Sequence, residues 1–286
     1  MDTEKYRALV YAADLGTISR AASQMGYTVS AVSRMIASLE EDYGFPLLIR
    51  AKTGVVPTKE CIRLLPLMRR LLADAEELYQ TGMQISGFQC GTVRIATAYS
   101  AFYDRISRVI RDFHETYPGI TVEIADGGYS SELTERLLRQ QIDAAIISER
   151  EADISFTPIC EDELVVLLPP DHPCSTLDRV PVEELERSPF IETYPGRDTD
   201  NIRMLHRNGI RPGTVFESND VFATVSMVRA GIGIALLNEI GCEFVGDRIC
   251  IRRLSPPQKV RIGIASLKKT PPATGLFLEA LKEVLL

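Results

Sequence analysis

The chain has 286 residues, of which 45% are hydrophobic and 25% are charged, and its formal net charge is −7. This length allows two or three domains with sizeable cores, and the composition excludes a disordered or fibrous protein. Residues 1–90 hold ten basic and ten acidic residues, whereas residues 91–286 hold 22 and 29. All the net negative charge therefore lies in the C-terminal part, and the N-terminal part can still present a basic face to nucleic acid.

Targeting signals and metal-ligand patterns are both absent from the sequence. The start, MDTEKYRALVYAADLG, has no basic segment followed by an apolar run, and no stretch approaches the roughly 20 apolar residues that span a bilayer. We therefore expect a cytoplasmic protein that does not contact the membrane. The six cysteines are scattered without a C-x-x-C pair, and there are only three histidines. We expect reduced thiols, no metal site and no cofactor.

The first 44 residues predict three short helices. The first covers residues 3–14, the second begins after Thr17 and ends at Gly26, and the third begins after Thr28 and ends at Gly44. Two helices joined by a tight turn that contains glycine are typical of a helix-turn-helix motif. The next segment, FPLLIRAKTGVVPT, has two short apolar runs around a turn, which predicts a two-stranded wing.

The third predicted helix has two unlike faces. At 100° per residue, one side carries Val32, Ile36, Leu39 and Tyr43, and the other carries Ser30, Ser33, Arg34 and Ala37. Small side chains let a surface come close to the helix backbone, and Arg34 can donate two parallel hydrogen bonds to a guanine edge or to phosphate. The alternative, a solvated face on a small helical domain, is favoured by this pattern taken alone.

A long helix is predicted from Thr58 to about Phe88, with Pro66 near its start. Its apolar stripe consists of Leu64, Leu65, Met68, Leu71, Leu72, Ala75, Leu78 and Tyr79. A helix of this length with a narrow apolar seam pairs more readily with another helix than with a small core. The stripe therefore predicts dimerisation.

Residues 90–286 alternate apolar strands with amphipathic helices. We expect strands near 92–98, 120–125, 143–147, 163–168, 189–192, 214–216, 232–237 and 260–266, and helices near 101–117, 130–140, 181–186, 199–208, 219–230 and 274–285. Such alternation predicts a largely parallel sheet covered on both faces, in one domain or two sub-domains.

Four strand-to-helix junctions of this region carry hydroxyl, amide or glycine residues, namely Ser100, Gly128 with Ser130, Thr193 with Tyr194, and Asn219. Parallel sheets bind ligands outside the carboxyl ends of their strands, where helix N-termini present free N–H groups. Ordinary helix capping is the better explanation for any single junction. Four junctions together predict a ligand cleft.

The segment ISRAASQMGYTVSAVSRMIASLEEDYGFPLLIRAKTGVVPT resembles the winged helix-turn-helix of LysR-type transcriptional regulators. The matching positions are Ala21, Ala22, Ala31, Ser33, Arg34, Ile36, Leu39, Glu40, Gly44, Leu47, Arg50, Pro57 and Thr58. Val29 stands where many members carry glutamine, and Leu48 replaces the usual phenylalanine. Residues 113–128 and 227–237 are similar to runs in the family's effector domain, although Asn238 stands where proline is usual.

The resemblance implies an α/β protein in three parts. These are a winged helix-turn-helix DNA-binding domain over residues 1–58, a linker and dimerisation helix over 59–89, and an effector-binding domain over 90–286. The effector domain would have the two-subdomain, periplasmic-binding-protein-like (type 2) fold. Subdomain I would comprise 90–161 and 265–286, and subdomain II would comprise 162–264.

The resemblance also implies which residues bind. The DNA-binding residues would be Thr17, Thr28, Val29, Ser30, Ser33, Arg34, Arg50 and Lys52, the last two lying on the wing near phosphate or the minor groove. A surface ion pair is the alternative for Arg50. The effector-binding residues would be Tyr99, Ser100, Ala101, Gly128, Tyr129, Thr193, Tyr194 and Asn219. Arg197 could pair with a ligand carboxylate unless Asp198 or Asp200 neutralises it.

The function implied is that of a transcriptional regulator that binds an interrupted inverted repeat in double-stranded DNA under the control of a small-molecule effector. It would act as a homodimer or homotetramer, with RNA polymerase as a further partner. One alternative is redox sensing by a cysteine pair, for which Cys160 and Cys174 are the available candidates. A second is an enzyme on the same two-lobed fold, although we find no catalytic residue set at the four junctions.

Overall fold

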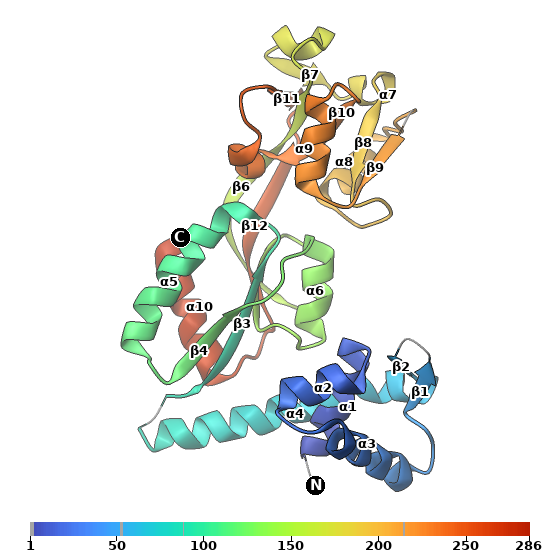
Figure 1. Ribbon diagram of the computed structural model, residues 1–286. Helices are drawn as coiled ribbons and strands as arrows, with labels where there is room; N and C mark the ends of the chain where they lie inside the picture. The colour runs from blue at the N-terminus through green and yellow to red at the C-terminus, as the bar shows by residue number, and fades with distance from the viewer. Residues whose placement is uncertain (1–2, 52–53, 88, 214) are drawn as a thin grey trace. The chain divides into compact units, whose positions relative to one another are not determined.

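The computed structural model describes residues 3–51, 54–87, 89–213 and 215–286 (Figure 1). Two compact units make up the chain. The first consists of Met1–Gly91 with Pro271–Ala273, and the second of Thr92–Thr270 with Thr274–Leu286. Among the described residues, none of the helices has the length and apolar character needed to cross a membrane.

The first unit contains four helices and a two-stranded sheet in its described part. They are α1 (Thr3–Leu15), α2 (Ile18–Met25), α3 (Val29–Tyr43), β1 (Leu48–Ala51), β2 (Gly54–Pro57) and α4 (Lys59–Ile85). The three predicted short helices, the wing and the long helix are confirmed. Thr17 caps α2 and Thr28 caps α3. The side-chain oxygen of each accepts a hydrogen bond from the backbone N–H of the third helical residue, Arg20 and Ala31 respectively, both at 3.2 Å.

The core of the first unit joins all four helices to the wing. Ala8, Leu9, Ala21, Val32 and Cys61 are among its fully buried or nearly fully buried members. On α3, three of the four residues assigned to the apolar face are buried, whereas Tyr43 is exposed and stacks on the ring of Phe45, 5.8 Å away between centroids. The difference arises because Tyr43 is the last residue of the helix, beyond the point where the core covers it.

Two backbone contacts fix the position of the wing. The Oε1 atom of Glu40 on α3 accepts hydrogen bonds from the backbone N–H of Leu47, at 2.8 Å, and of Leu48, at 3.1 Å. On β2, the N–H of Val55 donates to the carbonyl of Gly16, at 2.7 Å. The wing is therefore tied both to α3 and to the turn between α1 and α2.

The second unit begins with β3 (Gly91–Thr97), whose first residue falls in the first unit. It continues with η1 (Ser100–Phe102), α5 (Tyr103–Thr116), β4 (Ile120–Ile124), α6 (Ser130–Leu138), β5 (Ala144–Ser148), β6 (Ser155–Leu168), η2 (Pro173–Thr176), β7 (Arg179–Pro181), α7 (Glu184–Arg187) and β8 (Phe190–Thr193). It ends with α8 (Asp200–Asn208), β9 (Val215–Ser218), α9 (Val221–Arg229), β10 (Ile234–Asn238), η3 (Glu239–Phe244), β11 (Cys250–Ser255), β12 (Lys259–Ser266) and α10 (Pro272–Leu285).

The strands form two groups that share β6. The strand order is β4-β3-β5-β12-β6-β10-β8-β9, with β11 joining β6 to β7. We call the part built on β3, β4, β5 and β12 the first lobe and the part built on β7 to β11 the second lobe. Residues 155–163 of β6 pair with β12, and residues 164–168 pair with β10 and β11.

The prediction of a largely parallel sheet is wrong at the centre of the unit. Strands β3 and β5 are parallel, as are β8 with β9 and β8 with β10. However, β12 is antiparallel to β5 and β6, and β6 is antiparallel to β10 and β11. The antiparallel strands are the ones that carry the chain from one lobe to the other.

Each lobe buries both faces of its strands. In the first lobe, α5 and α10 lie on one face and α6 on the other (Figure 1), and the rings of Phe113 and Phe277 join α5 to α10. In the second lobe, Leu164, Val166 and Leu168 of β6 belong to the cluster that includes residues of α8, whereas Leu167 belongs to the cluster that includes residues of α9. The two-residue alternation expected of a strand thus separates the two cores.

We expect Gly54→Ala to destabilise the first unit by about 1–3 kcal/mol. Gly54 has φ +142°, and a Cβ atom there would lie 2.1 Å from the carbonyl oxygen of Gly16. The matched control is Gly82→Ala on α4, where a Cβ meets nothing within 4 Å and alanine favours the helix. Urea unfolding followed by circular dichroism measures both variants. Equal stability of the two would contradict the tight packing of the wing.

Candidate functional site

The exposed face of α3 brings together most of the residues predicted to bind DNA. Ser30 and Arg34 are exposed, and Ser33 is half-buried. The Nε atom of Arg34 donates to the carbonyl of Ser30, at 3.3 Å. This contact holds the arginine side chain along the helix, while its two terminal nitrogens form none of the described hydrogen bonds. The face can therefore approach another surface closely and offer a cation to it.

Val29, at the first turn of α3, is 49% exposed. It therefore does not belong to the apolar face that packs on the core. The hydroxyl groups of Thr28 and Ser30 lie 3.1 Å apart beside it. Val29 is exposed and carries methyl groups, and both of its neighbours in the sequence carry hydroxyl groups. Such a side chain is suited to contact with the methyl group of a thymine.

Arg50 on β1 is connected to α3 through a neutral contact. Its Nη2 atom donates to the Oγ atom of Ser33, at 3.2 Å. The described partner of Arg50 is thus a hydroxyl group, and its positive charge is added to that of Arg34 on the same side of the unit. Lys52 lies outside the described residues, and Thr17 is half-buried at the start of α2.

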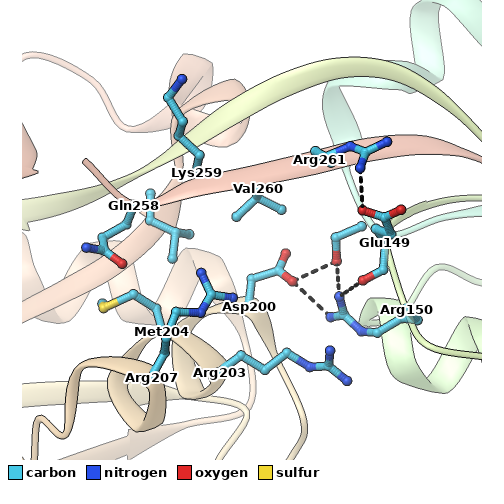
Figure 2. A pocket seen from close by; sticks show the side chains of 12 residues that line it. Glu149, Arg150, Asp200, Arg203, Met204, Arg207, Gln258, Lys259, Val260 and Arg261 are labelled. Atoms are coloured by element: carbon cyan, nitrogen blue, oxygen red, sulfur yellow. Dashed lines mark hydrogen bonds and ion pairs between the residues drawn. The ribbon is translucent and has the colours of Figure 1, made fainter. Parts of the chain in front are cut away.

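In the second unit, one carboxylate connects the two lobes. Asp200 is the first residue of α8 in the second lobe. Its Oδ2 atom accepts from the Tyr99 hydroxyl at 2.8 Å, and its Oδ1 atom accepts from the Oγ of Ser148 at 2.6 Å and from Nη2 of Arg150 at 2.9 Å. Figure 2 shows Asp200 and Arg150 joined at one side of a pocket. The three donors belong to the first lobe.

This ion pair is buried, because the side chain of Arg150 is 5% exposed and that of Asp200 is 10% exposed. Burial, together with the negative charge of Asp200, raises the pKa of the Tyr99 hydroxyl, which therefore remains a donor. An arginine and two hydroxyl donors form a typical arrangement for recognising an oxyanion. Here the protein supplies the oxyanion itself.

Two of the predicted effector residues meet across the lobes. The rings of Tyr129, before α6, and Tyr194, after β8, lie 6.3 Å apart between centroids. Tyr194 adopts a left-handed backbone with φ +60°. The guanidinium carbon of Arg197 lies 6.0 Å from the centre of the Tyr129 ring. Neither carboxylate proposed to neutralise Arg197 pairs with it, since Asp198 pairs with Arg203 and Asp200 with Arg150.

The remaining predicted effector residues have mixed positions. Ser100 is exposed and Ala101 is half-buried in η1, and Gly128 precedes α6, where a Cβ would lie 2.9 Å from a Glu132 oxygen. Thr193 is buried, with its hydroxyl 2.9 Å from that of Thr224. Asn219 is exposed, and the neighbouring Asp220 is the residue that caps α9.

Ser148, Arg150 and Asp200 are the functional candidates that the sequence reasoning missed. Ser148 ends β5, a fully buried strand, so the same rule about strand ends applies to it. No capped helix follows that strand, so no helix-start signal marks Ser148 in the sequence. Asp200 was considered only as a partner for Arg197.

Comparison with known proteins places both units in one family. Residues 86–286 match the model of the LysR substrate binding domain, and residues 3–61 match the model of the bacterial regulatory helix-turn-helix protein, lysR family. The chain belongs to the LysR family of transcriptional regulators. It therefore combines a DNA-binding helix-turn-helix domain with an effector-binding domain.

Relatives of this LysR-type regulator span its whole length. It is 25% identical over 289 residues to the uncharacterized HTH-type transcriptional regulator YvbU of Bacillus subtilis (strain 168), covering 99% of each chain. A full-length OxyR from Pseudomonas aeruginosa has the same fold, with a TM-score of 0.75 at 20% identity over 100% of this chain and 94% of that one. The regulatory domain of CcmR from Synechocystis PCC6803, in complex with 2-PG, matches 68% of this chain and 97% of its own, with a TM-score of 0.58 at 25% identity.

The cysteines are poorly arranged for redox sensing. All six are free thiols, and burial raises the pKa of Cys61 to about 11 and that of Cys242 to about 12. Cys160 lies on β6, where it pairs with Ile262 of β12, whereas Cys174 lies in η2 and belongs to a core cluster of the second lobe. Both cysteines are free thiols in the structure, and a disulfide would need their Cα atoms about 4.4–6.8 Å apart.

We expect Asp200→Asn to destabilise the second unit by about 3 kcal/mol, because Arg150 would keep a buried charge without its partner. The control is Asp198→Asn, whose ion pair with Arg203 has side chains 47% and 40% exposed and is worth less than about 1 kcal/mol. Urea unfolding compares the two variants. Similar losses would mean that the buried pair does not hold the lobes together.

We expect hydrogen peroxide to leave the DNA affinity of this regulator unchanged in a gel-shift assay. Burial raises the pKa of Cys61, Cys160, Cys174 and Cys242, and reactive cysteines require thiolates. Titration with a thiol reagent at mildly alkaline pH should leave Cys61 and Cys242 unmodified in the native chain and modify both after unfolding in urea. A peroxide-dependent change in DNA affinity would restore the redox alternative.

Proposed function

We propose that this LysR-type regulator binds an interrupted inverted repeat in duplex DNA through α3 and the wing, and that a small molecule bound between the two lobes controls the outcome. The proposal divides the chain into a DNA-binding domain over 1–58, a linker helix over 59–89 and an effector domain over 90–286. It assigns subdomain I to 90–161 and 265–286, and subdomain II to 162–264. The second boundary falls within β12, which we counted with the first lobe. The observation that carries the proposal is the bare, cationic face of α3 in a chain of this family.

Direct base reading by α3 would depend on few side chains. Arg34 can donate to a guanine edge or to phosphate, and Ser30 and Ser33 can bond to either. Val29 takes the place of the glutamine common in the family, so it would contribute apolar contact with a thymine methyl group rather than an adenine-specific pair. Thr17, Thr28, Arg50 and Lys52 would contact the backbone around this face.

The second half of α4 supports assembly into a homodimer or homotetramer. Cys61, Leu65 and Met68 pack into the core of the first unit. Further along the helix, Leu78 is 76% exposed and Ile85 is 83% exposed. Side chains of this kind are stable in water when a second helix covers them. Dimerisation would present two α3 helices to the two halves of an inverted repeat.

The boundary between the lobes supports a site for a small effector. Tyr99, Tyr129 and Tyr194 bring aromatic surface to it, and Ser100, Ala101, Gly128, Thr193 and Asn219 complete the proposed set. CcmR, whose regulatory domain is similar to this one, is in complex with 2-PG. An effector would favour one arrangement of the lobes and so change how the dimer sits on DNA. We place the regulator in the cytoplasm, where it would meet both partners.

An enzyme on this fold remains a weaker alternative. A histidine and a serine do meet, since Nε2 of His172 lies 3.0 Å from Oγ of Ser188. However, Nδ1 of His172 accepts from the N–H of Cys174, so Nε2 carries the proton, and Ser188 donates its own proton to Glu184 at 2.8 Å. This histidine is therefore not placed to act as a base toward the serine.

The first test of the proposal is the affinity of the Arg34→Ala variant for an operator. The operator is first selected from random duplexes with the unmodified full chain. We expect the specific affinity to fall by about 1–3 kcal/mol and the selectivity at one base position to relax. The control is Arg187→Ala, which removes an exposed arginine from the second unit. Gel shifts at several salt concentrations measure both variants. Unchanged affinity of Arg34→Ala at every salt concentration would refute the placement of α3.

A thermal-shift screen of metabolites against the full chain tests the effector part of the proposal. A ligand that binds the folded state raises the melting temperature by mass action. The stabilising compound should also alter the gel shift or the footprint on the selected operator. Stabilisation without any effect on the DNA complex would argue against a regulatory ligand.

A further inference from the structure

A cavity of about 190 Å³ lies between β12 and α8, beside the Asp200–Arg150 pair (Figure 2). Water occupies roughly 30 Å³ per molecule in the liquid, so the cavity has room for a small ligand. Its lining residues are Ser148, Glu149, Arg150, Leu164, Asp200, Arg203, Met204, Arg207, Gln258, Lys259, Val260 and Arg261. None of the residues predicted from the four junctions lines it.

The lining is strongly cationic. Arg150, Arg203, Arg207, Lys259 and Arg261 contribute five positive charges, against the two carboxylates of Glu149 and Asp200. Arg203 and Arg207 lie one helical turn apart on α8, while Lys259 and Arg261 lie two residues apart on β12 and so share one face of that strand. Figure 2 shows the Lys259 side chain extending from β12 away from α8, whereas Val260 packs against the cluster that includes Met204 and Leu205 of α8. The cationic lining therefore comes from Arg203 and Arg207 on the α8 side and from Arg150 in the first lobe.

Several of these cations have acidic partners at the margin. Lys259 pairs with Glu161 at 2.5 Å, Arg261 with Glu149 at 3.0 Å and Arg203 with Asp198 at 2.6 Å. For Arg207, the described part of the chain contains no ion-pair partner. These pairs lie on exposed side chains, where each is weak and can be exchanged for a ligand oxygen.

The cavity also has a buried polar wall. Arg150 is 5% exposed, and its Nε atom has no hydrogen-bond partner among the described residues. Leaving a buried donor of a charged group unsatisfied is costly. Its carboxylate partner, Asp200, lines the same cavity. The guanidinium group therefore has bonding capacity that a ligand oxygen could use.

We infer that this cavity binds a small oxyanion with two negative charges, such as a phosphate group, between Arg207 of α8 and Arg150 of the first lobe. Arg207, which is exposed, supplies charge at the mouth, and Arg150 supplies donors at the wall. The ligand competes with Asp200 for Arg150. Since Asp200 belongs to the second lobe and Arg150 to the first, binding weakens the contact between them. This role in lobe arrangement rests on the function proposed above, whereas the anion site itself does not.

The site is tested by calorimetric titration of the full chain with inorganic phosphate at constant ionic strength, with acetate as the singly charged comparison. We expect phosphate to bind and acetate not to bind detectably. Arg207→Gln should weaken phosphate binding about tenfold, as expected for the loss of one charged donor. The control is Arg108→Gln, which removes the same charge from an exposed position on α5 and should leave phosphate affinity unchanged.

A second pair of variants tests whether phosphate competes with Asp200 for Arg150. Asp200→Asn should bind phosphate several-fold more tightly than Asp112→Asn, a variant that removes an equal charge from the surface of α5. Absence of phosphate binding, or equal weakening in Arg207→Gln and Arg108→Gln, would overturn the site. Equal affinity in the two aspartate variants would overturn the competition.

A gel shift of the unmodified chain separates this inference from the proposed function. If the selected operator is bound and another metabolite alters the complex while phosphate does not bind, the regulator proposal stands and the anion site is refuted. If phosphate binds at the predicted cavity but no duplex is selected, the anion site stands and the DNA-binding proposal fails.

Discussion

Strand β6 belongs to both lobes of the second unit, and this continuity constrains everything built on it. Eight of its first nine residues pair with β12 in the first lobe, and its last five pair with β10 and β11 in the second. A hydrogen-bonded strand does not lengthen, so the lobes cannot simply move apart along it. They can change orientation by bending or twisting near the crossing. Contacts between side chains of the two lobes, above all Asp200 with Arg150, then decide which orientation is favoured.

In the first unit, the main structural constraint is that one face of α3 stays exposed. Helices with exposed small residues gain little stability from that face, so α3 depends on its caps and on burial of its opposite side. Thr28 and Gly44 terminate it, and Glu40 ties it to the wing. Because the carboxylate of Glu40 bonds to backbone N–H groups, it positions the wing independently of the side chains there. The wing residues remain available for contact with DNA.

Much of the fold was predictable from local sequence signals. Caps and terminating glycines defined α2 and α3, and helical periodicity defined α4, because these signals lie within a few residues of the features they specify. The start of β6 was not predictable, since residues 155–162 include Pro158 and two acidic residues and show no two-residue alternation. Likewise β11, with two adjacent arginines, becomes a strand only through pairing with β6 and β7. Pairing partners distant in the chain override local preference in such segments.

The residues of the candidate site show the same difference between local and long-range signals. Residues at the ends of strands were found when a helix-start signal accompanied them, whereas Ser148 and Arg150 were not. The contact between Arg150 and Asp200 joins positions 50 residues apart, and no local pattern encodes it. Helical periodicity alone predicts that Arg34 lies on the exposed face of α3. It could not assign Arg150 to a buried wall, since that depends on how two lobes meet.

The left-handed backbone of Tyr194 has an energetic consequence for the effector domain. A bulky residue in that region costs about 1–2 kcal/mol relative to glycine, which would adopt the same φ of +60° freely. Yet glycine would remove the ring that meets Tyr129. The chain thus keeps an aromatic contact between the lobes at the expense of a strained backbone at Tyr194, and the folded second unit is less stable by that amount than its contacts alone would make it. A difference of this size corresponds to about a five- to thirtyfold change in the folding equilibrium, so the contact between the two rings is kept at a measurable cost in stability.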